Sequence, residues 1–157
     1  MAIARSRGAR ERRHLSATVD TNVLIYAANA ADPVHEKARD LLERLARGPE
    51  LLFVFWPSAM GFLRISTNAA VLPTPLAHDE ALAAIADLID RPHVRTPSEQ
   101  PGFLDLYGAT APAGTSGRLV PDVHLATLMR QHGVGLIYTR DRSFRRFYGI
   151  KVLDPFG

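Results

Sequence analysis

Short runs of apolar residues alternate along this chain with longer segments that have the period of an amphipathic helix. The run Leu-Leu-Phe-Val-Phe-Trp at 51–56 is apolar at every position, which is typical of a strand covered on both faces of a sheet. Because such strands separated by helices favour parallel pairing, we expect an α/β fold with helices on both sides of the sheet. The expected strands are 17–20, 51–56, 93–96, 134–141 and 150–155.

The segments between these runs carry the start and stop signals of helices. In 32–50, Asp32 is suited to cap a helix, Pro33 to occupy its first position, and Gly48-Pro49 to end it. Trp56, at the end of an apolar run, is expected in the core. The expected helices are 22–29, 32–50, the segment opened by Pro57, part of 73–92 with Leu82, Ile85, Leu88 and Ile89 inward, part of 98–119, and 120–133, which ends at Gly133.

Length and composition exclude several classes of protein. A chain of 157 residues with 46% hydrophobic residues can bury the core of one domain. The absence of cysteine excludes disulfides, thiolate metal sites and a cysteine nucleophile, and it fits a reducing cytoplasm. Because no apolar run approaches the roughly 20 residues of a membrane span, we expect a cytoplasmic protein without membrane association.

Positive charge gathers at the N-terminus, where residues 1–17 hold five arginines and one acid, Glu11. We expect residues 1–16 to form a basic, flexible arm and residues 17–157 to form the single domain. Such an arm can contact nucleic acid. It can equally be a solvated leader, or precede the true start codon.

Three aspartates occupy positions where α/β proteins build sites. Asp20 ends the first expected strand, Asp141 follows the strand at 134–141, and Asp122 lies in the first turn of the last expected helix. Sites in open α/β sheets form beyond the carboxyl ends of the strands, so Asp20 and Asp141 should share one edge. Clustered carboxylates repel unless a cation neutralises them, and oxygen ligands suit Mg²⁺ or Mn²⁺. This pattern suggests metal-assisted hydrolysis of a phosphodiester.

Each acid also has a purely structural explanation. Asp20 can cap the helix that follows it, and Asp122 can be stabilised by the dipole of its own helix. Asp141 can be a turn residue or an ion-pair partner of Arg140 or Arg142. It is the joint pattern, rather than any single acid, that favours a site.

Four stretches of this chain form a pattern of acids and hydroxyls among apolar residues: "VDTNVLIYA" (19–27), "GFLRIST" (61–67), "LVPDVHLATLMRQHG" (119–133) and "YTRDRSFRRF" (138–147). Together they resemble PIN-domain ribonucleases, and most of all the VapC toxins of type II toxin–antitoxin pairs. The resemblance runs from about residue 17 to the C-terminus. It implies a three-layer α/β/α domain with a mainly parallel sheet, and a Mg²⁺- or Mn²⁺-dependent endoribonuclease that cuts structured RNA such as tRNA or rRNA. It also implies a VapB-like antitoxin partner and a homodimer.

The resemblance also assigns expected roles to particular residues. Asp20, Asp122 and Asp141 fall on the family's acidic positions and are the expected metal ligands and catalytic residues. Asn22 and Thr139 fall on polar positions that hold waters or carboxylates in place, and Arg64 falls on a supporting arginine position. His35 and His124 also fit recurring positions, where packing or surface hydrogen bonding is expected.

Gly61 departs from the family pattern, because many PIN domains have a glutamate three residues before the arginine that matches Arg64. One hypothesis is that Gly61 allows close packing by a neighbour. The other is that it vacates the place of a fourth carboxylate, which would weaken a second metal site. The second hypothesis leaves an alternative function open, namely a catalytically weakened PIN scaffold that acts mainly by binding a partner.

Cations surround the last motif. We expect them to bind RNA phosphates, although a solvated helix face would have the same composition. Phe144 and Phe147 in the same run are expected to pack inward. A phosphoacceptor domain is disfavoured because only one acid follows the first strand, and a DNA nuclease because the chain leaves little room for insertions. The expected RNA-binding residues are Arg140, Arg142, Arg145 and Arg146.

Overall fold

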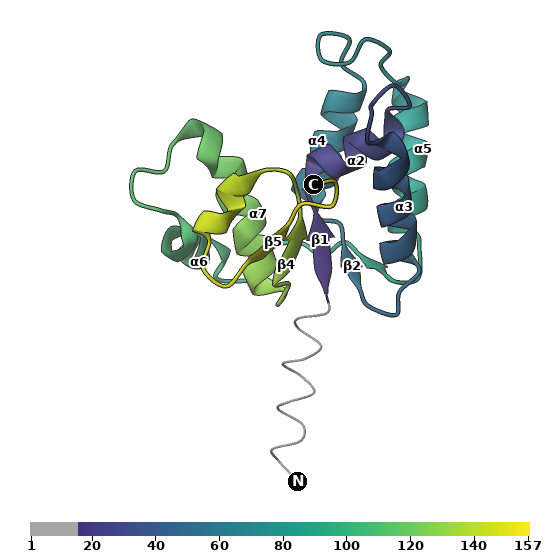
Figure 1. Cartoon of the computed structure of the whole chain (residues 1–157). Helices are drawn as coiled ribbons and strands as arrows, with labels where there is room; N and C mark the ends of the chain where they lie inside the picture. The colour runs from purple at the N-terminus through teal and green to yellow at the C-terminus, as the bar shows by residue number, and fades with distance from the viewer. Residues whose placement is uncertain (1–15) are drawn as a thin grey trace.

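The computed structural model describes residues 16–157, so the basic arm expected at 1–16 lies outside the described residues except for Ser16. Five parallel strands form one sheet in the order β3-β2-β1-β4-β5 (Figure 1). None of the described helices is long and apolar enough to cross a membrane. The strands are β1 (Ala17–Val19), β2 (Leu52–Phe53), β3 (Val94–Arg95), β4 (Leu136–Tyr138) and β5 (Lys151–Leu153).

The strand order contains a switch point between β1 and β4. The chain builds β1, β2 and β3 outward in one direction, then returns to place β4 on the other side of β1. Val19 pairs with Tyr138, so the two strands end level with each other. The next residues, Asp20 and Thr139, therefore leave the sheet side by side, at the position where open α/β sheets form their sites.

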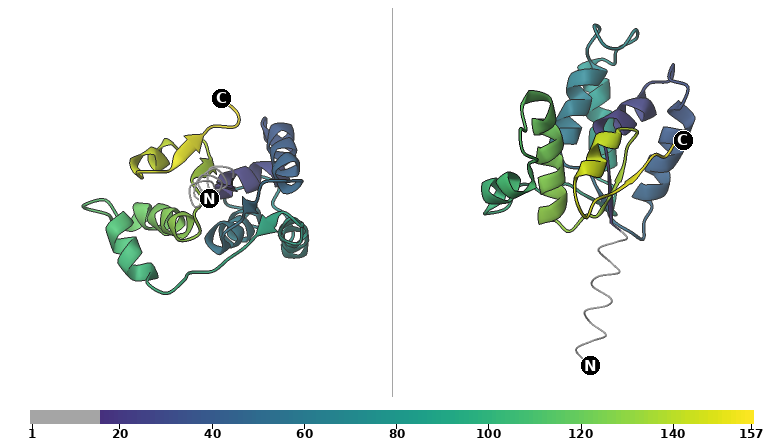
Figure 2. Two further views of the ribbon diagram at one scale, coloured as in Figure 1. Left: turned by 90° about the horizontal axis from the view of Figure 1, so that it is seen from below. Right: turned by 60° about the vertical axis from the view of Figure 1, so that its left-hand side comes forward.

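Helices cover both faces of the sheet, which confirms the expected three-layer α/β/α architecture. Helices α2 and α3 lie on one face and α7 lies on the other, with α6 outside it (Figure 2). The helices are α2 (Thr21–Ala28), α3 (His35–Ala46), α4 (Trp56–Ser66), α5 (His78–Ile89), α6 (Phe103–Thr110) and α7 (Val120–Gln131), with 3₁₀ helices η1 (Gly117–Leu119) and η2 (Arg142–Arg146).

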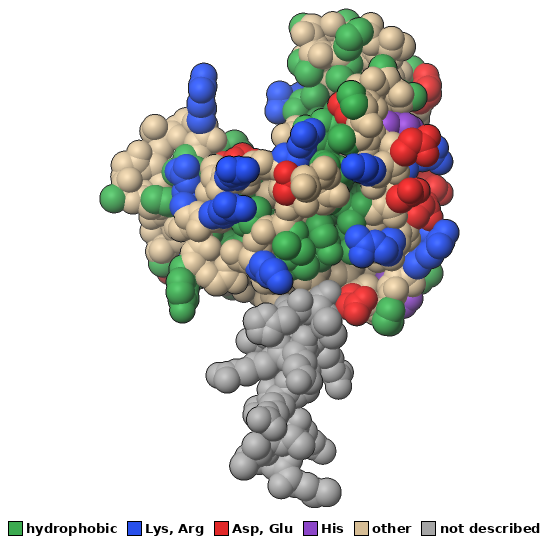
Figure 3. Space-filling view, in the orientation of Figure 1, with side chains coloured by type: hydrophobic (Ala, Val, Ile, Leu, Met, Phe, Trp, Pro, Cys, Tyr) green, Lys and Arg blue, Asp and Glu red, His purple; other side chains and the backbone are tan. Residues whose placement is uncertain are grey.

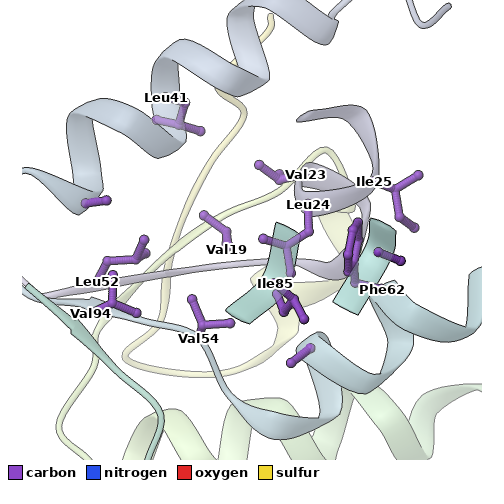
Figure 4. Close-up of a cluster of buried hydrophobic side chains, with 13 residues drawn as sticks. Val19, Val23, Leu24, Ile25, Leu41, Leu52, Val54, Phe62, Ile85 and Val94 are labelled. Atoms are coloured by element: carbon purple, nitrogen blue, oxygen red, sulfur yellow. The ribbon is translucent and has the colours of Figure 1, made fainter. Parts of the chain in front are cut away.

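The apolar run at 51–56 supplies side chains to two cores. Leu52 and Val54 pack with residues of α2, α3, α4 and α5 (Figure 4). Phe53 and Phe55 point to the opposite face and pack with α7 and η2. Alternation along an extended backbone explains this division, and it confirms that both faces of the sheet are covered.

Three local expectations were wrong. Helix α3 begins at His35, because the Asp32 carboxylate accepts a hydrogen bond from the Val34 N–H and forms the turn before the helix. Leu82 is 47% exposed, because α5 buries a narrower stripe centred on Ala81 and Ile85. Trp56 is 44% exposed, since it starts α4 beyond the end of β2 and so lies past the sheet.

Candidate active site

Asp20 lies directly after β1 and begins helix α2. Its Oδ1 accepts a hydrogen bond from the Thr21 N–H at 2.7 Å, and its Oδ2 accepts one from the Thr139 hydroxyl at 2.9 Å. The Thr139 oxygen also accepts a hydrogen bond from the Asp141 N–H at 2.9 Å. Thr139 therefore connects the acid after β1 to the backbone of the acid after β4.

Asp122 and Asp141 share a partner that the sequence analysis did not identify. The Ser143 hydroxyl donates a hydrogen bond to Asp122 Oδ2 at 3.1 Å, and the Ser143 N–H donates one to Asp141 Oδ1 at 2.8 Å. The second bond caps η2 and follows from local sequence, because an aspartate often accepts from the residue two positions later. The first bond joins η2 to α7, and no local signal predicts it.

The three aspartates are close enough to repel one another. Burial is the largest cause that raises the pKa of Asp20, the Thr139 and Thr21 hydrogen bonds lower it in part, and the charge of Asp141 raises it further. Burial likewise raises the pKa of Asp122; the Ser143 hydrogen bond opposes this, while the charges of Asp141 and Asp20 add to it. The fold thus brings together all three acids that the sequence singled out.

The donor chemistry of this cluster fits a divalent cation. The three acids offer carboxylate oxygens, which Mg²⁺ and Mn²⁺ prefer. Within residues 16–157, no lysine or arginine forms an ion pair with any of them. No group of three or more acids or histidines in this range is already arranged around a point that could hold an ion. The side chains would therefore have to converge on binding.

Two further residues from the family motifs, Asn22 and Arg64, lie on helices α2 and α4. Asn22 is exposed in the first turn of α2, two residues after Asp20, and its side chain makes no hydrogen bond to the described residues. Arg64 is exposed in the last turn of α4 and forms no hydrogen bond or ion pair with any of the three acids. Neither residue is therefore attached to the acids in this structure.

Gly61 packs against the residue next to Asp20. A Cβ atom at position 61 would lie 3.1 Å from both Cγ2 and Oγ1 of Thr21, which is closer than ordinary van der Waals contact. Gly61 therefore lets α4 approach the first residue of α2. This supports the packing hypothesis, since a side chain at 61 would crowd Thr21 unless one of the two shifted by a few tenths of an ångström.

The four arginines of the last motif differ in their contacts: Arg140 and Arg146 contact other groups of the fold, whereas Arg142 and Arg145 are exposed. The Arg140 guanidinium lies 5.8 Å from the centroids of both the Tyr26 and Phe156 rings. Arg146 is on η2, where its Nε donates a hydrogen bond to the Ser143 carbonyl at 2.9 Å. Figure 3 shows Lys and Arg side chains on both sides of a notch between the lobe of α7 and the lobe of α2 and α4, with acidic side chains near its floor. Arg142 and Arg145 on η2 are exposed.

The aromatic and histidine expectations for these segments are confirmed. Phe144 and Phe147 are buried under η2. His35 Nδ1 lies 2.9 Å from the Tyr26 carbonyl oxygen, and His124 Nε2 lies 2.7 Å from Glu99 Oε1. Both histidines thus hydrogen-bond within the fold.

An open pocket of about 180 Å³ lies elsewhere, between α2, α3 and α5. Its lining includes Leu24, Phe62 and Leu88, with the paired charges of Glu43 and Arg91 at its rim. None of the three aspartates lines it, so we assign it no part in catalysis.

Comparison with known proteins identifies the family of the chain. The family model described as "PIN domain" matches residues 17–150. The chain belongs to the PIN domain family. Ribonuclease VapC48 of Mycobacterium tuberculosis is 45% identical to this PIN domain over 143 residues, which cover 90% of this chain and 99% of that protein. Ribonuclease VapC33 of the same species is 32% identical, covering 87% of this chain and 95% of that protein.

Solved structures of more distant relatives share the fold. VapC20 of M. tuberculosis, described as a sarcin-ricin loop cleaving toxin, superposes with a TM-score of 0.61 at 18% identity, covering 85% of this chain and 98% of that one. VapBC2 from Rickettsia felis, bound to a DNA fragment from its promoter, gives a TM-score of 0.60 at 12% identity, covering 88% and 97%. At these identities the likeness supports the PIN fold alone.

Proposed function

We propose that this PIN domain is a divalent-metal-dependent endoribonuclease, the toxin of a VapBC-type pair, which hydrolyses phosphodiester bonds in structured RNA. The observation that carries the proposal is the meeting of Asp20, Asp122 and Asp141 at the switch point between β1 and β4. The 45% identity to a protein named Ribonuclease VapC48 supports the same activity.

The three acids are the proposed ligands of Mg²⁺ or Mn²⁺. Asp20 and Asp122 would hold the ion directly, and Asp141 would complete the site directly or through a water, since Mg²⁺ keeps several waters and few carboxylates. When bound, the ion supplies polarisation of a phosphoryl oxygen and a lower pKa of the attacking water.

The residues of the chain itself orient this site. The Thr21 N–H and the Thr139 hydroxyl each bind one oxygen of Asp20, which fixes the plane of the carboxylate. Asn22, exposed two residues after Asp20, is proposed to hold a water. Arg64 supports the site from α4 in this proposal. The cations proposed to bind RNA phosphates are Arg140, Arg142, Arg145 and Arg146.

The proposed partners follow the relatives. The substrate is a structured RNA, with tRNA or rRNA as candidates, and the description of VapC20 as a sarcin-ricin loop cleaving toxin supports a structured target. A VapB-like antitoxin is the proposed protein partner, supported by the VapBC2 complex, and the toxin is proposed to form a homodimer. A catalytically weakened scaffold is not favoured, because the PIN family match and the relatives named ribonucleases support an active enzyme. The packing against Thr21 gives Gly61 a structural reason of its own.

The first prediction tests the assignment of the acids. Asp20→Asn or Asp122→Asn should abolish RNA cleavage in Mg²⁺ with the fold retained, because each change removes a proposed metal-binding charge. RNA end-mapping after induced expression, and cleavage by purified protein, measure the effect, and circular dichroism checks the fold. Asp105→Asn is the matched control, since Asp105 is an exposed acid in the first turn of α6. If both variants cut RNA at the wild-type rate, the assignment is wrong.

A further inference from the structure

We infer that Ser143 is a positioning residue that links Asp122 to Asp141 and keeps the two carboxylates near each other in the proposed metal site. The inference rests on the proposed function, because it concerns the same three acids. It adds a residue that the family motifs did not single out in this chain.

All three hydrogen-bonding groups of Ser143 have partners in the site. Its hydroxyl donates to Asp122 Oδ2 at 3.1 Å, and its N–H donates to Asp141 Oδ1 at 2.8 Å. Its carbonyl accepts from Arg146 Nε at 2.9 Å. Hydrogen bonds to ionised groups are stronger than those between neutral groups, so these contacts keep Ser143 close to both acids.

Ser143 completes a continuous path of hydrogen bonds through the three acids. The path runs from Asp20 to Thr139, from Thr139 to the backbone of Asp141, and from Asp141 through Ser143 to Asp122. Within residues 16–157, the Ser143 hydroxyl is the sole hydrogen-bond donor to the Asp122 carboxylate. Removing it would therefore detach the acid of α7 from the acids at the strand ends.

The segment that carries Ser143 is anchored by burial. Phe144 is 1% exposed and Phe147 is 2% exposed, and both pack in the same apolar cluster as Val123 and Met129 of α7. This packing holds η2 against α7. The Ser143 hydroxyl is thus kept within reach of Asp122 by side chains that take no part in the site.

The consequence concerns metal affinity. Partners that orient metal ligands are typically worth about 10- to 100-fold in metal affinity. Ser143→Ala removes the hydroxyl but retains the N–H that binds Asp141, so it isolates the contact with Asp122. We expect this variant to bind Mn²⁺ about 10-fold more weakly than wild type in isothermal titration calorimetry.

Two further variants separate positioning from a general structural effect. Ser143→Thr keeps a hydroxyl and should restore Mn²⁺ affinity most of the way to the wild-type value. Ser116→Ala should leave the affinity unchanged, because Ser116 precedes η1 and its side chain makes no capping hydrogen bond there. RNA cleavage by Ser143→Ala should recover toward the wild-type rate when Mn²⁺ is raised to saturation.

The outcomes distinguish this inference from the proposed function. Wild-type Mn²⁺ affinity in Ser143→Ala, or equal losses in Ser143→Ala and Ser143→Thr, would overturn the role of Ser143 and leave the assignment of the acids standing. The second case is that Mn²⁺ affinity falls in the expected order from wild type to Ser143→Thr to Ser143→Ala, but the wild-type protein cuts no RNA. The proposed function then fails and the positioning role stands. If the wild-type protein binds no Mn²⁺, both are wrong.

Discussion

Asp20 uses one carboxylate for two purposes. It accepts the hydrogen bond that caps α2 from the Thr21 N–H, and at the end of β1 its charge interacts with those of the other two acids. Asp141 similarly caps η2 through the Ser143 N–H while its charge acts on Asp20 and Asp122. The structural and the functional explanations of these residues are therefore compatible, because a carboxylate has two oxygens and several lone pairs.

A pH prediction follows for Asp20. Burial raises its folded-state pKa above 3.8, so the folded state binds the proton more tightly than the unfolded state does. Protonation of Asp20 therefore contributes to the free energy of unfolding. This contribution is fully present below pH 3.8 and is lost as pH rises through the folded pKa. The asparagine of Asp20→Asn does not ionise, so this variant does not lose stability in this way as pH rises. We therefore expect it to melt at a higher temperature than wild type at pH 7 without metal.

Thermal unfolding of both proteins between pH 3.5 and pH 7, roughly the range over which carboxylates titrate, checks this sign. The difference in melting temperature should grow with pH. A lower melting temperature for Asp20→Asn at pH 7 would show that the two hydrogen bonds to the charged form outweigh the cost of burial.

The contact of Gly61 with Thr21 is also testable at the residue scale. Ala at 61 gains about 1 kcal/mol of helix propensity but must push against both γ atoms of Thr21. Thr21→Ala removes those atoms. A double-mutant cycle should therefore give a coupling of about 1 kcal/mol, with Gly61→Ala more favourable in the Thr21→Ala background. Urea unfolding measures this coupling energy. Additive effects of the two substitutions would show that the Thr21 side chain moves aside at no energetic cost.

The elements η2 and α7 hold two of the three acids in place, and their relative position depends on packing. η2 has five residues, too few to be stable alone, and burial of Phe144 and Phe147 holds it against α7. α7 presents Asp122 in its first turn because Pro121 is suited to the start of a helix and the following positions are buried. The relative placement of Asp122 and Asp141 is thus a property of the packing between the two elements.

Truncating the anchor of η2 should be costly. Phe144 is 1% exposed, so Phe144→Ala should lower the free energy of unfolding by about 3–5 kcal/mol through lost burial and a cavity. Tyr148→Ala is the control, because Tyr148 is 93% exposed and its loss should change stability by less than about 0.5 kcal/mol. Urea unfolding compares the two, and similar costs would mean that Phe144 does not anchor η2.

At the scale of the whole molecule, the strand order creates the site. Residues 20 and 139 are 119 positions apart, yet Thr139 Oγ1 lies 2.9 Å from Asp20 Oδ2 because β1 and β4 are neighbours. Assembly of the sheet places three like charges together. The metal-free fold therefore contains an electrostatic repulsion that a bound cation would relieve.

Mn²⁺ should accordingly stabilise the folded protein. A ligand that binds only the folded state adds about 2.7 kcal/mol at a concentration of 100 times its dissociation constant. Differential scanning calorimetry should show a rise in melting temperature that a chelator reverses and that Asp122→Asn reduces sharply. Asp105→Asn should keep the full rise, and an equal rise in Asp122→Asn would place the metal elsewhere.

Much of the fold could be predicted from the sequence because the relevant forces act between near neighbours in the chain. The apolar run at 51–56 indicated a strand with two buried faces, Pro57 marked the start of α4, and Gly133, at φ 68°, follows the end of α7. The candidate acids could be predicted for a related reason. The end of a parallel strand is a position that can be read locally, and the switch point brings such ends together.

The remaining features depend on which distant surfaces meet. Trp56 is exposed and Leu82 faces outward because the depth of burial along a helix depends on its neighbours in space, which periodicity does not specify. Ser143 reads locally as a turn residue, and only the packing of η2 on α7 makes its hydroxyl a partner of Asp122. The order of elements and the identity of the acids thus follow from the sequence, because they depend on local periodicity and caps. The hydrogen bonds that join the acids were decided by the tertiary structure, because they require sub-ångström placement of side chains far apart in the chain.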